Sequence, residues 1–600
     1  MDKNSITGVI LIVAIVFGYN LIYPPNVEEA KEQNNRTVIL QEEKANELEN
    51  QSLGSTKKDS LDKNQSLSKY GSFASSAFKK GQDVYLENEL LKLTISPKGG
   101  RITSAILKEY QTSDSLPLNL IAKDSSRFNL AFFSENRRIN SEELFFEASE
   151  ISNQKVVMRL VAENGGYIEY VYSIKPNDYM IDFEINHYNL QNLIASNQNT
   201  IDLNWEINLP HTEKSIENER MYSTTYFKYL NDDVDYLSES KDDEEELAGR
   251  AQWIGFKHQF FSSVLINNKG FEKPTNVAAY NNEFSNDFVR NLTATISLPY
   301  DHKKNGKNAM QFYFGPNHYE TLSSYNLDLE KMIPLGWGIF RWVNKYAVIP
   351  IFNLLSSWIS NYGIIILIMT FIIKMALAPF TLKAYMSQAK MKVLKPEIDK
   401  IQEKQKDKDP MKSQQEVMAL YKKTGVNPLG GCIPMLLQMP ILFALFRFFP
   451  ASIELRQQKF LWADDLSSYD SVLSLPFEIP FYGDHVSLFT LLMTISTLLY
   501  TRMNNQMSGP QMAQMKWMMY LMPVMFLGFF NNYAAGLSYY YFLANMVTFG
   551  QQFVMRKYFI DEASILRQME QNKKKPVKKS KFQKRLEEMA KKQQEKVKKR

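Results

Sequence analysis

The chain has 600 residues and a formal net charge of +5, and 44% of its residues are hydrophobic. This length excludes a single small domain, so several units are expected. The one cysteine, Cys432, excludes an intrachain disulfide and gives no sign of oxidising export. Polarity is uneven: residues 25–330 are mostly polar, whereas long apolar runs and lysine-rich pieces alternate in the remainder.

The N-terminus carries an apolar run between Asn4 and Pro24 that is long enough to cross a bilayer core. A cleaved signal peptide is the alternative, but prolines follow the run in place of an A-x-A-like cleavage site. We therefore expect residues 1–24 to form an uncleaved transmembrane anchor. Residues 25–82 are rich in Glu, Lys, Asn, Gln and Ser, a composition that predicts a flexible tether.

Residues 83–327 show the period-two pattern of β-strands. Their apolar runs alternate or are rich in β-branched and aromatic residues, and Gly, Asn, Asp and Pro separate them. So many strands predict a large antiparallel β-sandwich. We interpret the acidic cluster 242–246 as a solvated loop, and the six histidines show no metal-ligand spacing.

Residues 328–359 mix Trp, Phe, Leu and Ile with Arg341 and Lys345, which predicts an amphipathic helix lying on a membrane surface. An apolar, α-helical polytopic membrane core is expected over residues 360–556. Together with the N-terminal anchor it would make six spans, five of them in the core. The five are expected at about 361–382, 429–449, 486–500, 517–530 and 533–554.

The connector 383–426 has helical spacing in both of its halves and predicts a helical hairpin, with a plain solvated linker as the alternative. Lysine crowds this connector and the tail 557–600, whereas the loop 451–484 is acidic. Because basic loops stay on the cytoplasmic side, both termini and the connector are predicted to be cytoplasmic. Residues 25–340 and the acidic loop then lie outside.

Lys374 interrupts the first span of the core. A charge at mid-helix costs about 2.5–3.5 kcal/mol on insertion scales and usually faces a bundle interior or water. Snorkelling is the alternative, but Lys374 lies roughly 13 Å before Lys383 along a helix, which exceeds the reach of its side chain. The sequence therefore predicts a water-filled groove, which Thr370 would share because it lies four residues earlier.

Other spans supply polar side chains that could face this groove. Gln438 lies in the second core span, and a tyrosine cluster, Tyr539 to Tyr541, lies in the last. An interfacial belt is the alternative for Tyr539. Tyr541 and Asn545 are four residues apart, which predicts a shared inward face.

The basic tail predicts binding to ribosomal RNA or anionic lipid, without base-specific recognition because aromatic residues are few. A generic orientation signal is the alternative. The residues concerned are Lys573, Lys574, Lys575, Lys578, Lys579, Lys598, Lys599 and Arg600.

Catalytic interpretations are disfavoured. A Ser–Lys dyad would need a serine at helical spacing from Lys374, and its span has none. Residues 429–432 resemble a lipobox only superficially, because they lie deep in the chain. A small-solute transporter would normally show internal repeats, and the sequence shows none. No catalytic residue, metal or cofactor is therefore expected.

Several long stretches closely resemble the YidC/Oxa family of membrane protein insertases. Further forward, the sequence resembles the large periplasmic domain of the Gram-negative YidC type. Nearly the whole chain is covered, except the tether and the tail. The stretches are 370–398, 427–446, 454–467 and 534–552 in the core, and 93–107, 251–266 and 314–322 in the forward part.

The resemblance implies a five-helix core with a hydrophilic groove that is open to the cytoplasm and the lipid and closed outside. Lys374 stands where the family typically has arginine, so it keeps the charge but loses the planar bidentate fork. A diffuse electrostatic role is then expected. The groove and the substrate slide beside it would be lined by Thr370, Gln438, Met439, Tyr540 and Tyr541, with Asn545 nearby.

The resemblance also implies a function. The chain would insert and help fold inner-membrane proteins, alone or with the Sec translocon, in a bacterial inner membrane. Its partners would be nascent membrane proteins, the translocon, the ribosome and membrane lipids, with no sequence-specific nucleic acid. Its β-domain would be periplasmic, and its two termini would be cytoplasmic.

Overall fold

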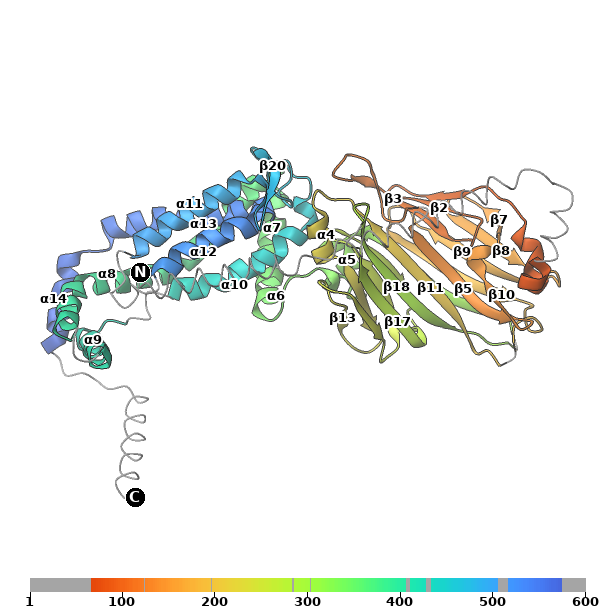
Figure 1. Cartoon of the computed structure of the whole chain (residues 1–600), viewed down its shortest axis with the longest axis horizontal. Coiled ribbons are helices and arrows are strands. Elements are labelled where there is room, and N and C mark those ends of the chain that lie inside the picture. Colours follow the sequence, from red (N-terminus) through yellow and green to blue (C-terminus); the bar gives the residue numbers. More distant parts are fainter. Residues whose placement is uncertain are drawn as a thin grey trace, which may run out of the picture.

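The computed structural model describes residues 66–122, 125–195, 197–282, 285–302, 304–405, 410–427, 433–505 and 516–574. These form an elongated molecule with a β-rich half at one end and a helical half at the other (Figure 1). The expected anchor, 1–24, and most of the expected tether, 25–82, lie outside the described residues. Residues 71–77 of that tether form a 3₁₀ turn, η1, whose Phe73 is fully buried against Phe132. The expectation of a flexible tether was therefore wrong for this stretch, because its apolar side chains pack on the β-half.

The β-half contains two large antiparallel sheets. One has nine strands in the order β13-β12-β15-β16-β19-β10-β9-β8-β7, and the other has six in the order β14-β17-β18-β11-β5-β6. A four-stranded sheet, β1-β2-β3-β4, lies beside them. The strands are β1 Val84–Glu87, β2 Leu91–Ile95, β3 Ile102–Gln111, β4 Pro117–Asn119, β5 Ser126–Ser134, β6 Arg137–Asn140, β7 Glu147–Ile151, β8 Lys155–Val161, β9 Tyr167–Ile174, β10 Met180–Tyr188, β11 Thr200–Pro210, β12 Thr224–Tyr229, β13 Val234–Tyr236, β14 Asp243–Glu246, β15 Ala251–Lys257, β16 Phe261–Ile266, β17 Glu272–Asn281, β18 Phe288–Pro299 and β19 Gly306–Pro316.

Aromatic side chains from the two large sheets meet between them. Trp205 of the six-stranded sheet stacks on Phe256 of the nine-stranded sheet with ring centroids 3.9 Å apart. Phe128 meets Phe183 edge-to-face at 5.6 Å. Such pairs add to the burial of apolar area that holds two sheets face to face. The expected large antiparallel β-sandwich is therefore confirmed.

The acidic cluster 242–246 is not a loop, and the sequence-based interpretation was wrong in this respect. Residues 243–246 form β14, which pairs with β17 at the edge of the six-stranded sheet. Its side chains are mostly exposed, as expected for a solvated segment. Charged side chains on an edge strand keep that edge from pairing with other chains.

The helical half is built around one very long helix, α8, which runs from Tyr362 to Gln405. The expected first span and the first arm of the connector are thus one continuous helix. The other helices are α4 Ile216–Tyr222, α5 Tyr319–Ser324, α6 Ile339–Val343, α7 Ile349–Ser356, α9 Pro410–Thr424, α10 Ile433–Phe448, α11 Leu488–Asn505, α12 Lys516–Asn531, α13 Ala535–Tyr558 and α14 Glu562–Lys574.

The end of α8 and α9 form the helical hairpin expected for the connector. Ala389, Leu394 and Ile398 of α8 pack on Val417 of α9 in a separate apolar cluster. Helix α14 completes this cluster, and Figure 1 shows α9 and α14 at the end of the molecule that is far from the β-half. Whether the hairpin is cytoplasmic stays a prediction.

The surface helix expected over 328–359 is present over residues 339–356, with a π-helical turn in its middle. Helices α6 and α7 are joined by a π-helical turn, Asn344–Val348. Asn344 is fully buried, and its amide donates to the carbonyl oxygens of Leu335 and Ala444 at 2.9 and 2.8 Å. Around it, Trp337, Trp342 and Trp358 are largely exposed, as a membrane-surface segment requires.

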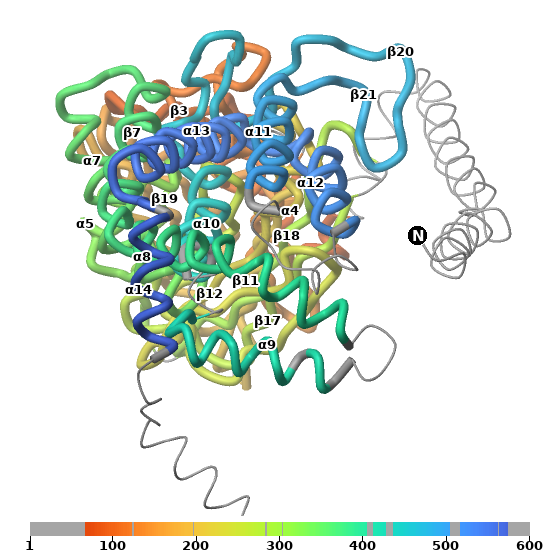
Figure 2. Tube along the Cα trace, turned by 90° about the vertical axis from the view of Figure 1, so that its left-hand side faces the viewer, coloured from red at the N-terminus to blue at the C-terminus, as the bar shows by residue number. Residues whose placement is uncertain are grey.

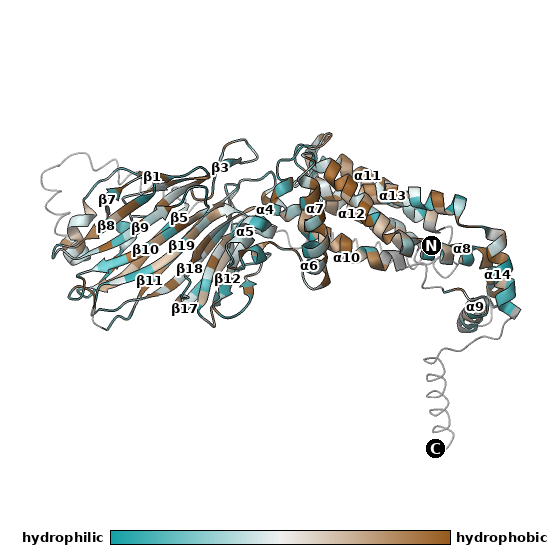
Figure 3. Ribbon diagram, turned by 180° about the vertical axis from the view of Figure 1, so that it is seen from behind, coloured by the Kyte–Doolittle hydropathy of each residue, from teal (hydrophilic) through white to brown (hydrophobic). Residues whose placement is uncertain are grey.

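Apolar residues predominate along helices α10, α11 and α12 of the helical half, as the brown colour in Figure 3 shows. By length and composition, one helix in the described ranges, Tyr362–Lys404, could cross a membrane. Three shorter apolar helices accompany it, at Leu436–Ala451, Leu488–Met503 and Trp517–Asn531. The count of six spans therefore stays a prediction.

Candidate functional site

Lys374 lies inside the helical half and is only 5% exposed. Its ammonium donates to Oε1 of Gln438 and to Oγ1 of Thr548, both at 3.0 Å. These acceptors come from α10 and α13, so three helices surround one charge. The sequence predicted the approach of Gln438 to Lys374, and the structure places the two in direct contact.

The charge of Lys374 is held by neutral groups. An ammonium has three N–H donors, and side chains accept two of them here. Within the described ranges, no carboxylate forms an ion pair with it. A buried charge without a counter-ion is costly unless water or a ligand solvates it. The ammonium of Lys374 can therefore attract a negatively charged group of another molecule.

Helix α13 turns a polar stripe toward α8 and α11. Asn545 donates to Ser496 and Thr497 of α11 at 2.9 and 3.0 Å, so it faces α11 rather than Lys374. The other residues of the stripe, Thr548, Gln551 and Gln552, face α8. Gln551 donates to the backbone oxygen of Lys374 at 3.0 Å, and Gln552 to the hydroxyl of Tyr385 at 2.9 Å.

Some buried polar atoms of α13 have no protein partner within the described ranges. They are the Oε1 atoms of Gln551 and Gln552 and the hydroxyl of Tyr540. Buried polar groups are nearly always hydrogen-bonded to protein or to water. Of these residues Gln551 contacts Lys374, through that residue's backbone oxygen, so its unpartnered oxygen is a place where water or a ligand can bind beside the lysine.

The remaining predicted groove residues differ in placement. Thr370 is fully buried, but its hydroxyl donates to the carbonyl of Ile366 in its own helix at 2.6 Å. Tyr540 is buried with its ring 6.2 Å from that of Phe449. Met439 and Tyr541 are half-buried and reach the surface of the bundle.

Sequence reasoning missed Thr548, Gln551 and Gln552. A signal was present, because Thr548 and Gln552 follow Asn545 by three and seven residues. That spacing continues one helix face.

The tail residues are mostly outside the described residues. Lys573 lies near the end of α14, where its ammonium pairs with the carboxylate of Glu397 in α8 at 2.5 Å. It therefore fastens α14 to the hairpin. Nothing is described for the side chain of Lys574, or for Lys575, Lys578, Lys579, Lys598, Lys599 and Arg600.

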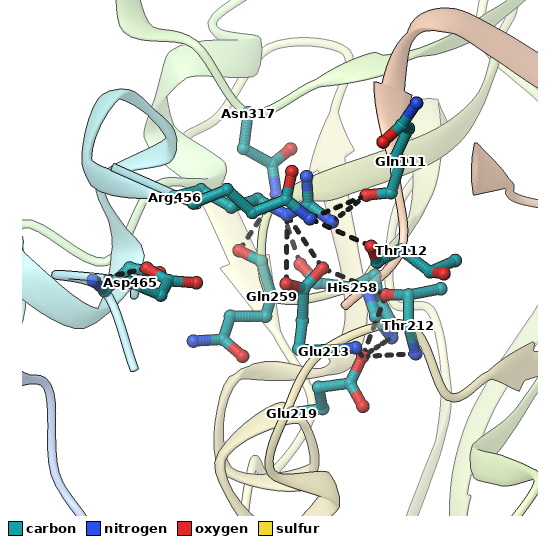
Figure 4. A network of polar contacts seen from close by, with 12 residues as sticks. Gln111, Thr112, Thr212, Glu213, Glu219, His258, Gln259, Asn317, Arg456 and Asp465 are labelled. Carbon is teal, nitrogen blue, oxygen red and sulfur yellow. Dashed lines mark hydrogen bonds and ion pairs between the residues drawn. The ribbon is translucent and has the colours of Figure 1, made fainter. Parts of the chain in front are cut away.

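A polar junction joins the two halves of the molecule (Figure 4). Arg456, from the loop that follows α10, points into the β-half. Its Nε lies 2.9 Å from both carboxylate oxygens of Glu213, and its Nη2 donates to the carbonyl of Gln111. The Arg456 and Glu213 side chains are 3% and 7% exposed. This ion pair is therefore sealed from water.

A second carboxylate, Glu219, lies behind the first. It accepts hydrogen bonds from the backbone of Thr212 and Glu213, and it pairs with His258 at 3.1 Å and His211 at 3.3 Å. Burial acts to raise the pKa of Glu219, but the histidines and hydrogen bonds outweigh it and lower that pKa.

For Glu213, burial prevails. Although Arg456 opposes the shift, burial raises the pKa of Glu213 to about 7. The charge of the Arg456–Glu213 pair therefore responds to pH near neutrality.

Further contacts extend the junction on both sides. Gln259 donates to the carbonyl of Pro450 at 2.8 Å, and the hydroxyls of Tyr222 and Tyr533 are 2.9 Å apart. No cluster of three metal-ligating side chains occurs in the parts of the chain that the structure describes. The junction is thus a set of hydrogen bonds and ion pairs between the two halves.

The fold and the site define a class: a protein whose apolar helical core, with a buried charge, carries a large β-sandwich. Comparison with known proteins gives the family. A model of the "60Kd inner membrane protein" family matches residues 354–562, and one of the "YidC periplasmic domain" family matches residues 83–349. The chain belongs to the YidC family.

Curated relatives align over almost the full length. A protein of Parabacteroides distasonis named membrane protein insertase YidC is 42% identical, with 99% of this chain and 98% of that protein covered. One of the same name from Bacteroides fragilis is 41% identical, with the same shares covered. A crystal structure described as an active YidC insertase is 17% identical, with 80% of this chain and 94% of that chain covered and a TM-score of 0.32.

Proposed function

We propose that this chain inserts inner-membrane proteins into the bilayer and helps them fold, by means of a hydrophilic groove that opens to the cytoplasm. The observation that carries the proposal is the ammonium of Lys374, buried among neutral groups from three helices. Full-length relatives named membrane protein insertase support it. The chain is thus a non-enzymatic insertase with nascent membrane proteins as substrates and a periplasmic β-domain.

The mechanism follows from the cost of dehydration. A polar tail that crosses a bilayer must lose its hydration, which is expensive. The wetted interior around Lys374, Gln551 and Gln552 shortens the dry part of the path, and Lys374 attracts acidic residues in the tail. The apolar helix that follows leaves for the lipid by hydrophobic partitioning.

We assign the groove residues to two places. Lys374, Thr370, Gln438 and Asn545 belong to its polar interior. The half-buried Met439 and Tyr541 form the slide for the departing apolar helix, because soft and aromatic surfaces adapt to varied sequences. Tyr540 supports the slide from within, since it is fully buried.

The proposed topology has six spans, namely the anchor 1–24 and helices α8, α10, α11, α12 and α13. It is supported by the layout in Figure 1, where the β-half lies at one end of the bundle and the lysine-rich hairpin with α14 lies at the other. Residues 25–340 and the acidic loop 451–484 are then periplasmic. Both termini and the hairpin are cytoplasmic, in accord with the positive-inside rule.

The domain limits proposed are 25–70 for the tether, 71–327 for the periplasmic domain, on which η1 packs, 328–359 for the interfacial segment, 360–556 for the core and 557–600 for the tail. Partners proposed beyond the substrates are the Sec translocon, membrane lipids and the ribosome. The supporting feature for the last two is the basic tail, whose charge suits phosphate groups.

The experiment that tests this function uses the purified chain in proteoliposomes. Insertion of a short membrane protein with an acidic tail is followed by protection of that tail from added protease, and vesicles without the chain report spontaneous insertion. The release of a trapped small solute is measured in the same vesicles. We expect insertion without solute release. Solute release without insertion would assign the chain to the transporters and overturn the proposal.

A further inference from the structure

The loop between α10 and α11 contains a β-hairpin, formed by β20 (Leu473–Ile479) and β21 (Gly483–Val486). Leu473, Leu475, Phe477 and Ile479 are the apolar side chains of β20, and they recur at every second residue along it. Phe481 extends the series at the tip. Leu473 and Phe477 are 57% and 61% exposed, and Phe481 is 89% exposed. The hairpin thus presents an unpartnered apolar ridge.

The chemistry of the ridge excludes several partners. Residues 473–486 contain no lysine or arginine, so the hairpin offers no positive charge to a nucleic acid or an acidic peptide. Its acidic residues, Glu478 and Asp484, would repel anionic surfaces and are not members of the ridge. Contiguous exposed apolar side chains on an otherwise folded protein mark a binding surface for an apolar partner.

The hairpin is held firmly against the end of α12. Asn531, the last residue of that helix, donates to the carbonyls of Tyr482 and His485 at 2.9 and 2.8 Å. The ring of His485 in turn lies 3.0 Å from the carbonyl of Asn531. The carbonyl of Phe481 lies so close to Gly528 that a Cβ there would approach it to 2.5 Å. The ridge is therefore placed by fixed contacts.

The ridge continues an apolar surface of the bundle. Helix α12 exposes a set of apolar side chains along its length, and its last turn is where the hairpin tip lies. The exposed set is Leu521, Met522, Val524, Met525, Phe526 and Phe529. Since the proposed function places this surface in the hydrocarbon of the bilayer, the ridge lies at its outer margin.

A second feature marks the same level. In Figure 1 the β20–β21 hairpin and the segment α6–α7 lie at the same position along the horizontal long axis, where the bundle meets the β-half. In Figure 2 they lie on different sides of the bundle. The α6–α7 segment exposes Trp337, Trp342 and Trp358, and tryptophan collects at the boundary between water and lipid.

We infer that the β20–β21 hairpin binds lipid: its Leu473–Phe481 ridge lies in the interfacial layer of the outer leaflet, beside α12. This inference rests on the membrane placement given by the proposed function. With α6–α7 on the other side, the bundle has two contacts with the same leaflet. They fix the height and tilt of the groove relative to the bilayer.

The test uses the full chain with Cys432→Ser, reconstituted in phospholipid vesicles, and single cysteines labelled with an environment-sensitive fluorophore. The reporter positions are Phe477→Cys and Phe481→Cys. Tyr85→Cys, on the exposed face of β1, is the control in water. Leu499→Cys, exposed on α11, is the control in lipid. Quenching by iodide in the buffer is compared with quenching by lipids that carry a spin label near the headgroup.

We expect labels at Phe477 and Phe481 to be quenched by the labelled lipid and to be several-fold less accessible to iodide than the label at Tyr85. Iodide access equal to that at Tyr85 would place the ridge in water and overturn the inference. Protection from iodide without quenching by lipid would reveal a protein partner and would also overturn it. If Leu499 is not quenched by lipid, the membrane placement itself fails, and the two failures are thereby distinguished.

Discussion

The buried pair of Arg456 and Glu213 gives the most quantitative prediction. The change Arg456→Leu leaves the Glu213 carboxylate buried beside Glu219 without its guanidinium. Removing one partner of a buried pair costs about 3–5 kcal/mol. Glu213 can limit that cost by taking up a proton. Because burial already raises the pKa of Glu213 to about 7, the proton is taken up readily at pH 7, and the cost is expected at the lower end of this range.

We therefore expect Arg456→Leu to lower the free energy of unfolding by about 3 kcal/mol at pH 7. The assay is urea denaturation of the full chain in detergent, with intrinsic fluorescence as the readout. The matched control is Arg447→Leu. Arg447 also reaches the β-half, but its distance to Glu239 is 3.8 Å and its side chain is 45% exposed. Its loss should cost at most about 1 kcal/mol.

A double variant decides whether the charge is the cause. Replacing both partners, in Arg456→Leu with Glu213→Leu, leaves no uncompensated charge and should recover much of the lost stability. If Arg456→Leu is no more harmful than Arg447→Leu, the junction does not contribute as the geometry indicates. If the two single losses simply add in the double variant, the pair is not coupled, and the reasoning is refuted.

Two further predictions concern the periplasmic side of the molecule. Because the pKa of Glu213 is about 7 in the folded chain and 4.5 in the unfolded one, the folded state binds more protons between these values. The free energy of unfolding should then fall as pH rises from 4.5 to 7, by up to about 3 kcal/mol, and this part of the slope should vanish in Glu213→Gln; an identical pH profile for the variant would contradict it. The second prediction concerns Asp470, which is buried and accepts hydrogen bonds from the backbone of Leu488 and Phe489 and from the indole of Trp462. Asp470→Ala should lower the midpoint of unfolding and cost about 2–3 kcal/mol, whereas the neighbouring, mostly exposed Asp464→Ala should cost little.

The sequence predicted those parts of the fold that depend on patterns within a short segment. Period-two alternation marks the strands of the sandwich, because each strand buries one face whatever its neighbours are. Helical spacing marks the connector for the same reason. A single lysine in an apolar run predicted a polar interior, because the cost of burying a charge depends on the residue itself.

Other features depend on partners that are distant in the chain. Arg456 and Glu213 are separated by 243 residues, and no sequence pattern around either residue indicates that the two are in contact. Residues 451–484 were interpreted only as an acidic loop, and the strand β20 within them was not predicted from its apolar residues. The π-helical turn between α6 and α7 begins at Asn344, whose amide donates to a carbonyl of α10. Such contacts appear only once the chain is folded.

The central claim is that the charge of Lys374 assists the passage of acidic segments. The direct measurement compares Lys374→Leu with Lys374→Arg, at matched levels in proteoliposomes, on one substrate whose translocated tail carries either Asp or Asn. An attraction between opposite charges a few Å apart at intermediate dielectric is on the order of a few kcal/mol. The account predicts that Lys374→Arg retains insertion of both tails and that Lys374→Leu impairs the Asp tail far more than the Asn tail. Equal impairment of both tails, or full activity of Lys374→Leu on both, would contradict it.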